Sequence, residues 1–117
     1  MITMRRLCAL LALLTMCDLA SAKGGVMHAE DRYNPQHIDS LPPEIRRAIL
    51  EKCPAPKALH DFAHYAENPR RIVLHFEYLL CDGEHTFCGR AGCLHEVYDF
   101  AKGRYRLVRS YYAPPGD

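Results

Sequence analysis

Apolar residues recur at helical spacing in one stretch of the chain. They stand on one side of the expected helix: Ile38, Leu41, Ile45, Ala48 and Ile49. Pro43 suits a first helical turn, where no backbone N–H is needed, and Asp39 or Ser40 can act as the cap. Cys53-Pro54 ends the pattern. The spacing therefore predicts an amphipathic helix over about residues 42–52.

After residue 57 the chain follows the two-residue period of strands. Ile72 and Leu74 fall on one face of the stretch 71–80 and His75 falls on the other, which predicts a strand over all ten residues. Residues 59–66 are predicted to form the preceding antiparallel strand. A turn connects residues 59–66 to the strand over residues 71–80.

The C-terminal part of the chain predicts a hairpin around a two-residue turn at Lys102-Gly103. In this register apolar residues face apolar residues and most charged residues face opposite charges, which cross-strand pairing favours. The predicted pairs are Phe100–Tyr105, Tyr98–Leu107, Leu94–Tyr111, Val97–Val108, Asp99–Arg106 and Glu96–Arg109.

Together these elements predict a single α+β domain over residues 38–112. Its N-terminal amphipathic helix packs on one face of a small antiparallel sheet of about four strands. Residues 23–37 are expected to be a flexible leader, and residues 113–117 a loose tail. The predicted core consists of Ile45, Ile49, Ile72, Leu74, Phe76, Tyr78, Leu94, Tyr98, Tyr105 and Leu107.

The first 22 residues have the three parts of a secretory signal peptide. Arg5-Arg6 precedes a short apolar run, and Ala20 and Ala22 form an A-x-A cleavage site. The run is too short to span a bilayer as a helix, so no stable membrane span is expected after cleavage. The signal predicts cleavage after Ala22 and export to the periplasm or medium of a bacterium. A lipoprotein signal, with Cys17 as the lipidated residue, is the alternative.

Cleavage leaves four cysteines, Cys53, Cys81, Cys88 and Cys93. An even number in a small exported chain predicts two disulfides. The favoured pairs are Cys88–Cys93, which closes a short loop with two glycines, and Cys53–Cys81, which staples the helix to the sheet. The other two connectivities stay open. A competing interpretation is a zinc site of Cys88, Cys93, His85 and His95, although the spacing departs from C-x2-C.

The cysteine loop and the hairpin also carry a resemblance. The sequence FCGRAGCLHEVY over residues 87–98 is followed by GRYRLV over residues 103–108. With LPPEIR at residues 41–46 and HFE at residues 75–77, this pattern resembles small secreted proteins of rhizobia-like alphaproteobacteria, over about two thirds of the mature chain. The resemblance implies a disulfide-bonded periplasmic module with no assigned activity.

Three polar residues, His75, Glu77 and His95, fall on the second face of the predicted sheet. If the strands that carry the two histidines pair, this set could hold a metal ion or support acid–base chemistry, with Phe62, His60 and His64 alongside. The favoured interpretation is that these histidines are solvated on the face that the helix leaves open. Metal binding by His75, Glu77 and His95 is the alternative.

The remaining features exclude several function classes. G-x-S-x-G, H-E-x-x-H, P-loop and G-x-G-x-x-G motifs do not occur, so we expect no enzyme, no catalytic residue and no cofactor. Removing the signal leaves 13 of the 15 basic and 13 of the 14 acidic residues, and this neutral balance argues against nucleic acid. The expected function is a non-enzymatic interaction or structural module of the periplasm. Its partner would be an envelope protein or peptide, bound on the open sheet face or an edge strand.

Overall fold

The computed structural model describes residues 32–115. The predicted signal peptide lies outside these residues, together with Cys17, Ala20 and Ala22. The described part contains two helices, seven strands and two 3-10 turns. In chain order they are α2 (Gln36–Asp39), α3 (Pro43–Lys52), β1 (Pro56–Ala58), η1 (His60–Phe62), β2 (Ala63–Ala66), β3 (Arg71–His75), η2 (Phe76–Tyr78), β4 (Leu79–Cys81), β5 (Cys88–Gly89), β6 (Gly92–Ala101) and β7 (Arg104–Ala113).

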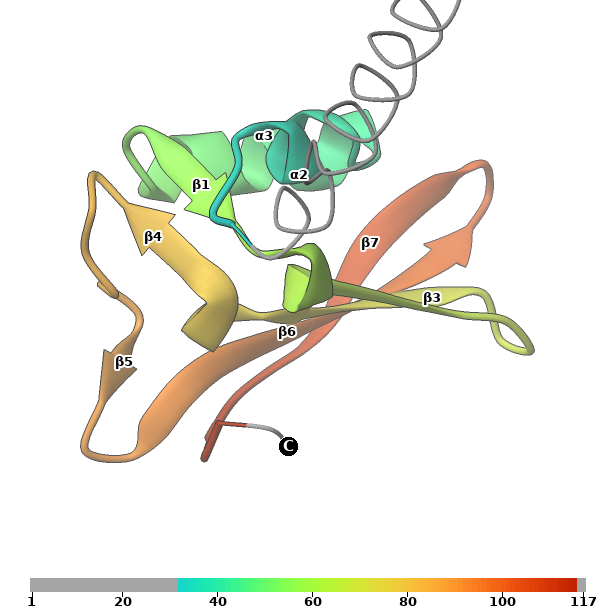
Figure 1. Cartoon of the computed structure of the whole chain (residues 1–117). Helices are drawn as coiled ribbons and strands as arrows, with labels where there is room; N and C mark the ends of the chain where they lie inside the picture. Colours follow the sequence, from blue (N-terminus) through green and yellow to red (C-terminus); the bar gives the residue numbers. More distant parts are fainter. Residues whose placement is uncertain (1–31, 116–117) are drawn as a thin grey trace, which may run out of the picture.

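The strands form two antiparallel sheets, and α2 and α3 lie together on one side of the larger one (Figure 1). In the five-stranded sheet the order is β2-β3-β6-β5, and β7 pairs with the other edge of β6. The second sheet pairs β1 with β4. The α+β class is confirmed. The expectation of about four strands is wrong, because the described chain has seven.

Helix α3 occupies the predicted stretch, but it is not the N-terminal element. Within the described residues α2 precedes it, and Asn34 bridges Ala58 of β1. Secondary structure thus begins inside the predicted leader. The expected cap is also wrong, since the N-cap position is Pro42 and no side chain caps the helix. Glu44 in its first turn instead accepts the backbone N–H of Tyr105 in β7, at 3.2 Å.

The core lies between α3 and the larger sheet. Eight of the ten predicted core residues are buried: Ile45, Ile49, Ile72, Leu74, Phe76, Leu94, Tyr98 and Tyr105. Leu107 is 49% exposed, although it pairs with the buried Tyr98 as predicted. Tyr78 is only partly buried, since it belongs to η2 and not to a continuing strand.

The strand predicted over residues 71–80 is interrupted. β3 ends at His75, η2 turns the chain, and β4 then joins the other sheet. Phe76 is buried at the break, where its ring meets those of Phe62 and Phe87 edge-on at 5.6 and 5.1 Å between centroids. Packing of this aromatic cluster coincides with the break, which the alternating sequence does not show.

The hairpin of β6 and β7 keeps the predicted register only near its turn. Phe100–Tyr105, Asp99–Arg106 and Tyr98–Leu107 pair as predicted. Beyond them a β-bulge at Val108 inserts one residue into β7 and shifts the register by one. The predicted pairs Val97–Val108, Glu96–Arg109 and Leu94–Tyr111 are therefore wrong, and the observed pairs are Val97–Arg109, Glu96–Ser110 and Leu94–Tyr112.

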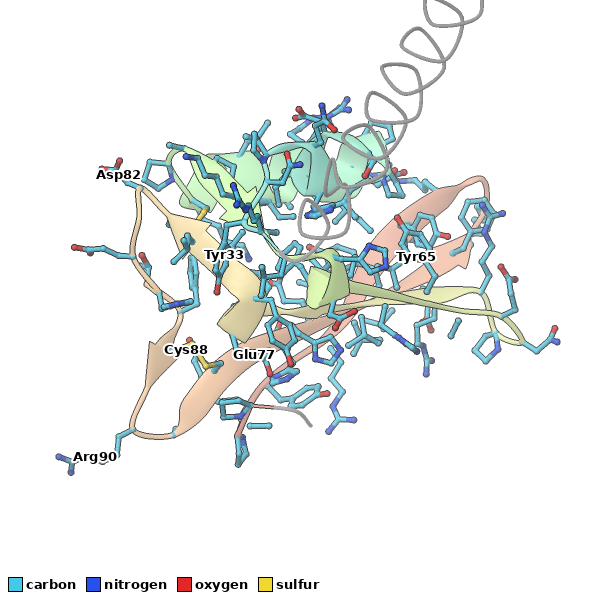
Figure 2. All side chains as sticks on the ribbon, viewed as in Figure 1. Tyr33, Tyr65, Glu77, Asp82, Cys88 and Arg90 are labelled. Carbon is cyan, nitrogen blue, oxygen red and sulfur yellow. A yellow bond between two sulfur atoms is a disulfide. The ribbon has the colours of Figure 1, made fainter. Side chains whose placement is uncertain are left out.

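Two disulfides join Cys53 to Cys81 and Cys88 to Cys93. The first ties the end of α3 to β4, and the second closes the loop between β5 and β6 (Figure 2). Gly92 in this loop has a positive φ, and a Cβ there would collide with the carbonyl group of Ala113. Only glycine fits that position. None of the helices in residues 32–115 is long and apolar enough to cross a membrane.

Candidate metal centre

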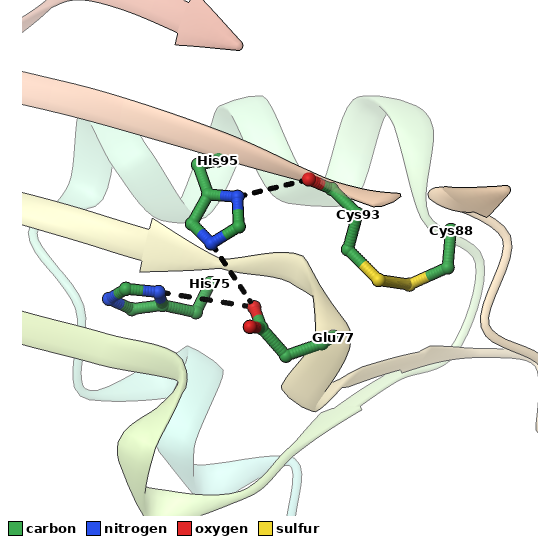
Figure 3. Close-up of a disulfide and its surroundings, with 5 residues drawn as sticks. All are labelled: His75, Glu77, Cys88, Cys93 and His95. Carbon is green, nitrogen blue, oxygen red and sulfur yellow. Dashed lines mark hydrogen bonds and ion pairs between the residues drawn. A yellow bond between two sulfur atoms is a disulfide. The ribbon is translucent and has the colours of Figure 1, made fainter. Parts of the chain in front are cut away.

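Three polar side chains converge below β3 and β6. His75 is the last residue of β3 and lies directly opposite His95 of β6, while Glu77 comes from η2 (Figure 3). Oε1 of Glu77 lies 3.6 Å from Nε2 of His95 and 3.9 Å from Nδ1 of His75. One donor atom from each residue lies within 4.8 Å of the other two. These are the residues that the sequence offered as a metal site.

Glu77 reaches this position because the strand breaks. In an uninterrupted strand Glu77 would stand about 7 Å further along the chain direction than His75, beyond the pair of histidines. The 3-10 turn at residues 76–78 shortens that advance and directs the carboxylate back toward the end of β3 (Figure 3). The convergence therefore depends on a turn that the strand prediction did not contain.

The ring of His95 is oriented by the backbone. Its Nδ1 lies 3.0 Å from the carbonyl oxygen of Cys93. A carbonyl oxygen can only accept, so Nδ1 carries a proton, and whenever the ring is neutral Nε2 holds the lone pair. Among the described residues no hydrogen-bond partner meets Nε2, although His95 is fully buried. A buried nitrogen lone pair that faces a carboxylate oxygen favours a cation between them.

The three side chains differ in their access to solvent. The side chains of His95 and Glu77 are 0% and 6% exposed, and that of His75 is 18% exposed. Burial lowers the pKa of His75 below its usual value, against the opposing attraction of Glu77, and nearby His95 lowers it further. His75 is thereby held in the neutral form that ligates metals.

The prediction that these histidines are solvated is wrong for His95. Its ring is sandwiched between His75, which meets it edge-on at 5.0 Å between centroids, and Tyr111, which stacks on it at 5.1 Å. Tyr111 comes from β7, and the bulge at Val108 puts it opposite His95. Sequence reasoning missed Tyr111 because a periodic pattern carries no signal for a single inserted residue.

The other histidines named from the sequence do not join this set. His60 and His64 are exposed and line a pocket that His75 also borders. Phe62 is a fully buried core residue. The alternative zinc site is wrong, since the sulfur atoms of Cys88 and Cys93 are bonded to each other. A disulfide leaves no thiolate to bind zinc.

The set has the composition of a divalent-metal site. Two imidazoles and one carboxylate occur as protein ligands of zinc and of other first-row transition ions. Zinc with nitrogen and oxygen ligands would hold them about 3.3 Å apart. The two separations from Glu77, 3.6 and 3.9 Å, are longer than that value, and the donor atoms of the two histidines lie within 4.8 Å of each other. The three side chains would therefore have to draw closer together around a bound ion.

Comparison of the chain with protein-family models, with curated proteins and with solved structures found no match.

Proposed function

We propose that this is an exported, non-enzymatic protein that binds one divalent transition-metal ion, such as zinc, through His75, Glu77 and His95. The observation that carries the proposal is the buried Nε2 of His95, which has no hydrogen-bond partner among the described residues and faces Glu77. His75 supplies the third donor. The carbonyl of Cys93 fixes the ring of His95, as outer partners do for metal-binding histidines.

Export into an oxidising compartment is part of the same proposal. Two disulfides in one small domain are typical of secreted and periplasmic proteins and rare in the cytosol. The signal-like N-terminal sequence supports the same destination.

Calorimetric titration of the purified protein with Zn²⁺ at neutral pH tests the proposal. We expect binding with a stoichiometry of one and a loss of affinity of at least about 100-fold in His75→Ala and in Glu77→Gln. Glu77→Gln preserves the shape of the side chain, so the variant should keep its fold. Circular dichroism checks this. His85→Ala is the matched control, because His85 is exposed and outside the set.

The competing arrangement is an ion pair between protonated His95 and Glu77. Such a pair requires no metal, and then Zn²⁺ gives no heat in the titration. Absence of binding, or equal affinity in His75→Ala and His85→Ala, would overturn the proposal.

Peptide binding along β7 is a second candidate. The outer edge of β7 pairs with no strand of the described chain, and Leu107, Val108 and Tyr112 are each about half exposed on it. Arg106 and Arg109 lie on the same strand, so an extended acidic peptide is the expected partner. A fluorescent glutamate-rich peptide should lose affinity for Arg106→Glu but not for Arg47→Glu, which alters an exposed arginine of α3. Equal loss in both variants would reject an edge-specific site.

A further inference from the structure

A pocket of about 470 Å³ lies beside the metal set, which consists of His75, Glu77 and His95. The chain between α2 and α3, η1 and β2 build its walls, and His75 contributes to its lining. This volume is within the range of pockets that hold small organic ligands. His75 is the one member of the metal set that lines the pocket, and it is also the most exposed of the three. The pocket thus borders the metal set through His75.

The lining combines hydrogen-bonding groups with an apolar base. His60, His64 and Tyr65 supply polar atoms, and Leu41 and Leu59 supply apolar surface. Asp61 is the one acidic residue of the lining. Imidazole N–H and phenol O–H groups can donate to the oxygen atoms of an anion. The apolar side chains can pack against a short carbon skeleton.

The charge of the loaded site also favours an anion. A divalent ion bound by one carboxylate and two neutral imidazoles keeps a net charge of about +1. Three protein donors leave at least one coordination position open, even in a four-coordinate site. His95 and Glu77 are buried, so a ligand in the pocket would have to approach that position past His75.

We propose that the pocket binds a small organic carboxylate whose oxygen completes the coordination of the ion held by His75, Glu77 and His95. This inference rests on the proposed metal site. The pocket selects the ligand through its polar wall, and the metal supplies the charge. The chain then binds its ligand only when the metal is present.

The test uses Co²⁺ as the bound metal, because its visible absorption reports changes in coordination, and benzoate as the probe. We expect benzoate to alter the spectrum of the Co²⁺-loaded protein saturably, and the neutral analogue benzamide to leave it unchanged. The double variant His60→Ala/His64→Ala should bind Co²⁺ as the unmodified protein does but weaken benzoate binding about tenfold. Both residues are exposed, so their removal leaves the core intact. His85→Ala, outside the pocket, is the control.

The outcomes separate the two proposals. Failure of Co²⁺ and Zn²⁺ to bind overturns the metal site and this inference together. Metal binding with no spectral response to benzoate, or with equal benzoate affinity in the double variant, overturns the pocket ligand and leaves the metal site standing.

Discussion

The ring of Tyr111 lies nearly parallel to the ring of His95, with 11° between their planes and 5.1 Å between their centroids. This contact exists because Val108 is an extra residue in β7. Without the bulge, the register set by Tyr98 and Leu107 would place Ser110 opposite His95. A single inserted residue thus covers the most deeply buried member of the candidate metal centre with an aromatic ring.

The ring of Tyr111 should contribute more to the stability of the fold than the ring of Tyr112. Tyr111→Ala is expected to lower the free energy of unfolding by about 2 kcal/mol, because a partly buried aromatic contact is lost. Tyr111→Phe keeps the ring and should change the free energy of unfolding by less than about 0.5 kcal/mol. Tyr112→Ala is the control, since Tyr112 is 56% exposed. Urea unfolding measures all three, and equal effects at Tyr111 and Tyr112 would contradict the role of the stack.

Deletion of Val108 should be tolerated. It removes the bulge but leaves Arg109 opposite Val97 and Tyr111 opposite His95. Nuclear Overhauser contacts between the rings of His95 and Tyr111 are expected to persist in the deletion variant. Insertion of an alanine after Ser110 is the matched control, because it moves Tyr111 past His95 and should abolish those contacts. Loss of the contacts on deletion would show that the bulge has another role.

The two disulfides should differ in their contributions to stability. Cys53 and Cys81 are 28 residues apart, while Cys88 and Cys93 are 5 apart. Since a longer closed loop restricts the unfolded chain more, the double alanine variant of the first pair should lose roughly 3.5 kcal/mol and that of the second roughly 2 kcal/mol. Thermal unfolding of the two variants shows which one loses more stability. A larger loss for the Cys88–Cys93 variant would contradict the prediction.

Stability at acidic pH should depend on Asp99. Its carboxylate accepts two hydrogen bonds from Arg71, at 2.6 and 3.1 Å, and this contact lowers the pKa of Asp99. The unfolded chain has an aspartate pKa of about 3.9. The stabilisation is therefore present above about pH 4 and is lost as the pH falls through the lower folded-state value.

Asp99→Asn should remove this part of the acid dependence, as measured by urea unfolding between about pH 2 and pH 6. The control is Asp82→Asn, because Asp82 is exposed in the turn after β4. If both variants follow the same pH profile, Asp99 does not carry the effect.

Local patterns in the sequence were sufficient to predict the main elements of the fold. The period of Ile45 and Ile49 predicted α3, and the alternation around Ile72 and Leu74 predicted β3. The number and spacing of the cysteines favoured the disulfide pairs that the structure contains. These features depend on neighbours a few residues apart, or on a small number of possible pairings, so the sequence expresses them directly.

The candidate site was only partly predictable. The sequence named His75, Glu77 and His95, since a pairing of two strands would bring the histidines together, and the structure places them opposite each other. It did not predict that His95 is buried. Its burial depends on the ring of Tyr111, whose position follows from the bulge in another strand.

By itself, then, the sequence determined the helix, the strand β3, the turn of the hairpin and the residue types available for metal binding. Tertiary structure decided where β3 stops and where the register of β7 shifts. Packing of Phe76 against Phe62 and Phe87 coincides with the first break, and those rings come from separate segments of the chain. Contacts between distant segments leave no periodic trace in the local sequence, and for that physical reason only the folded chain brings Glu77 and Tyr111 to His95.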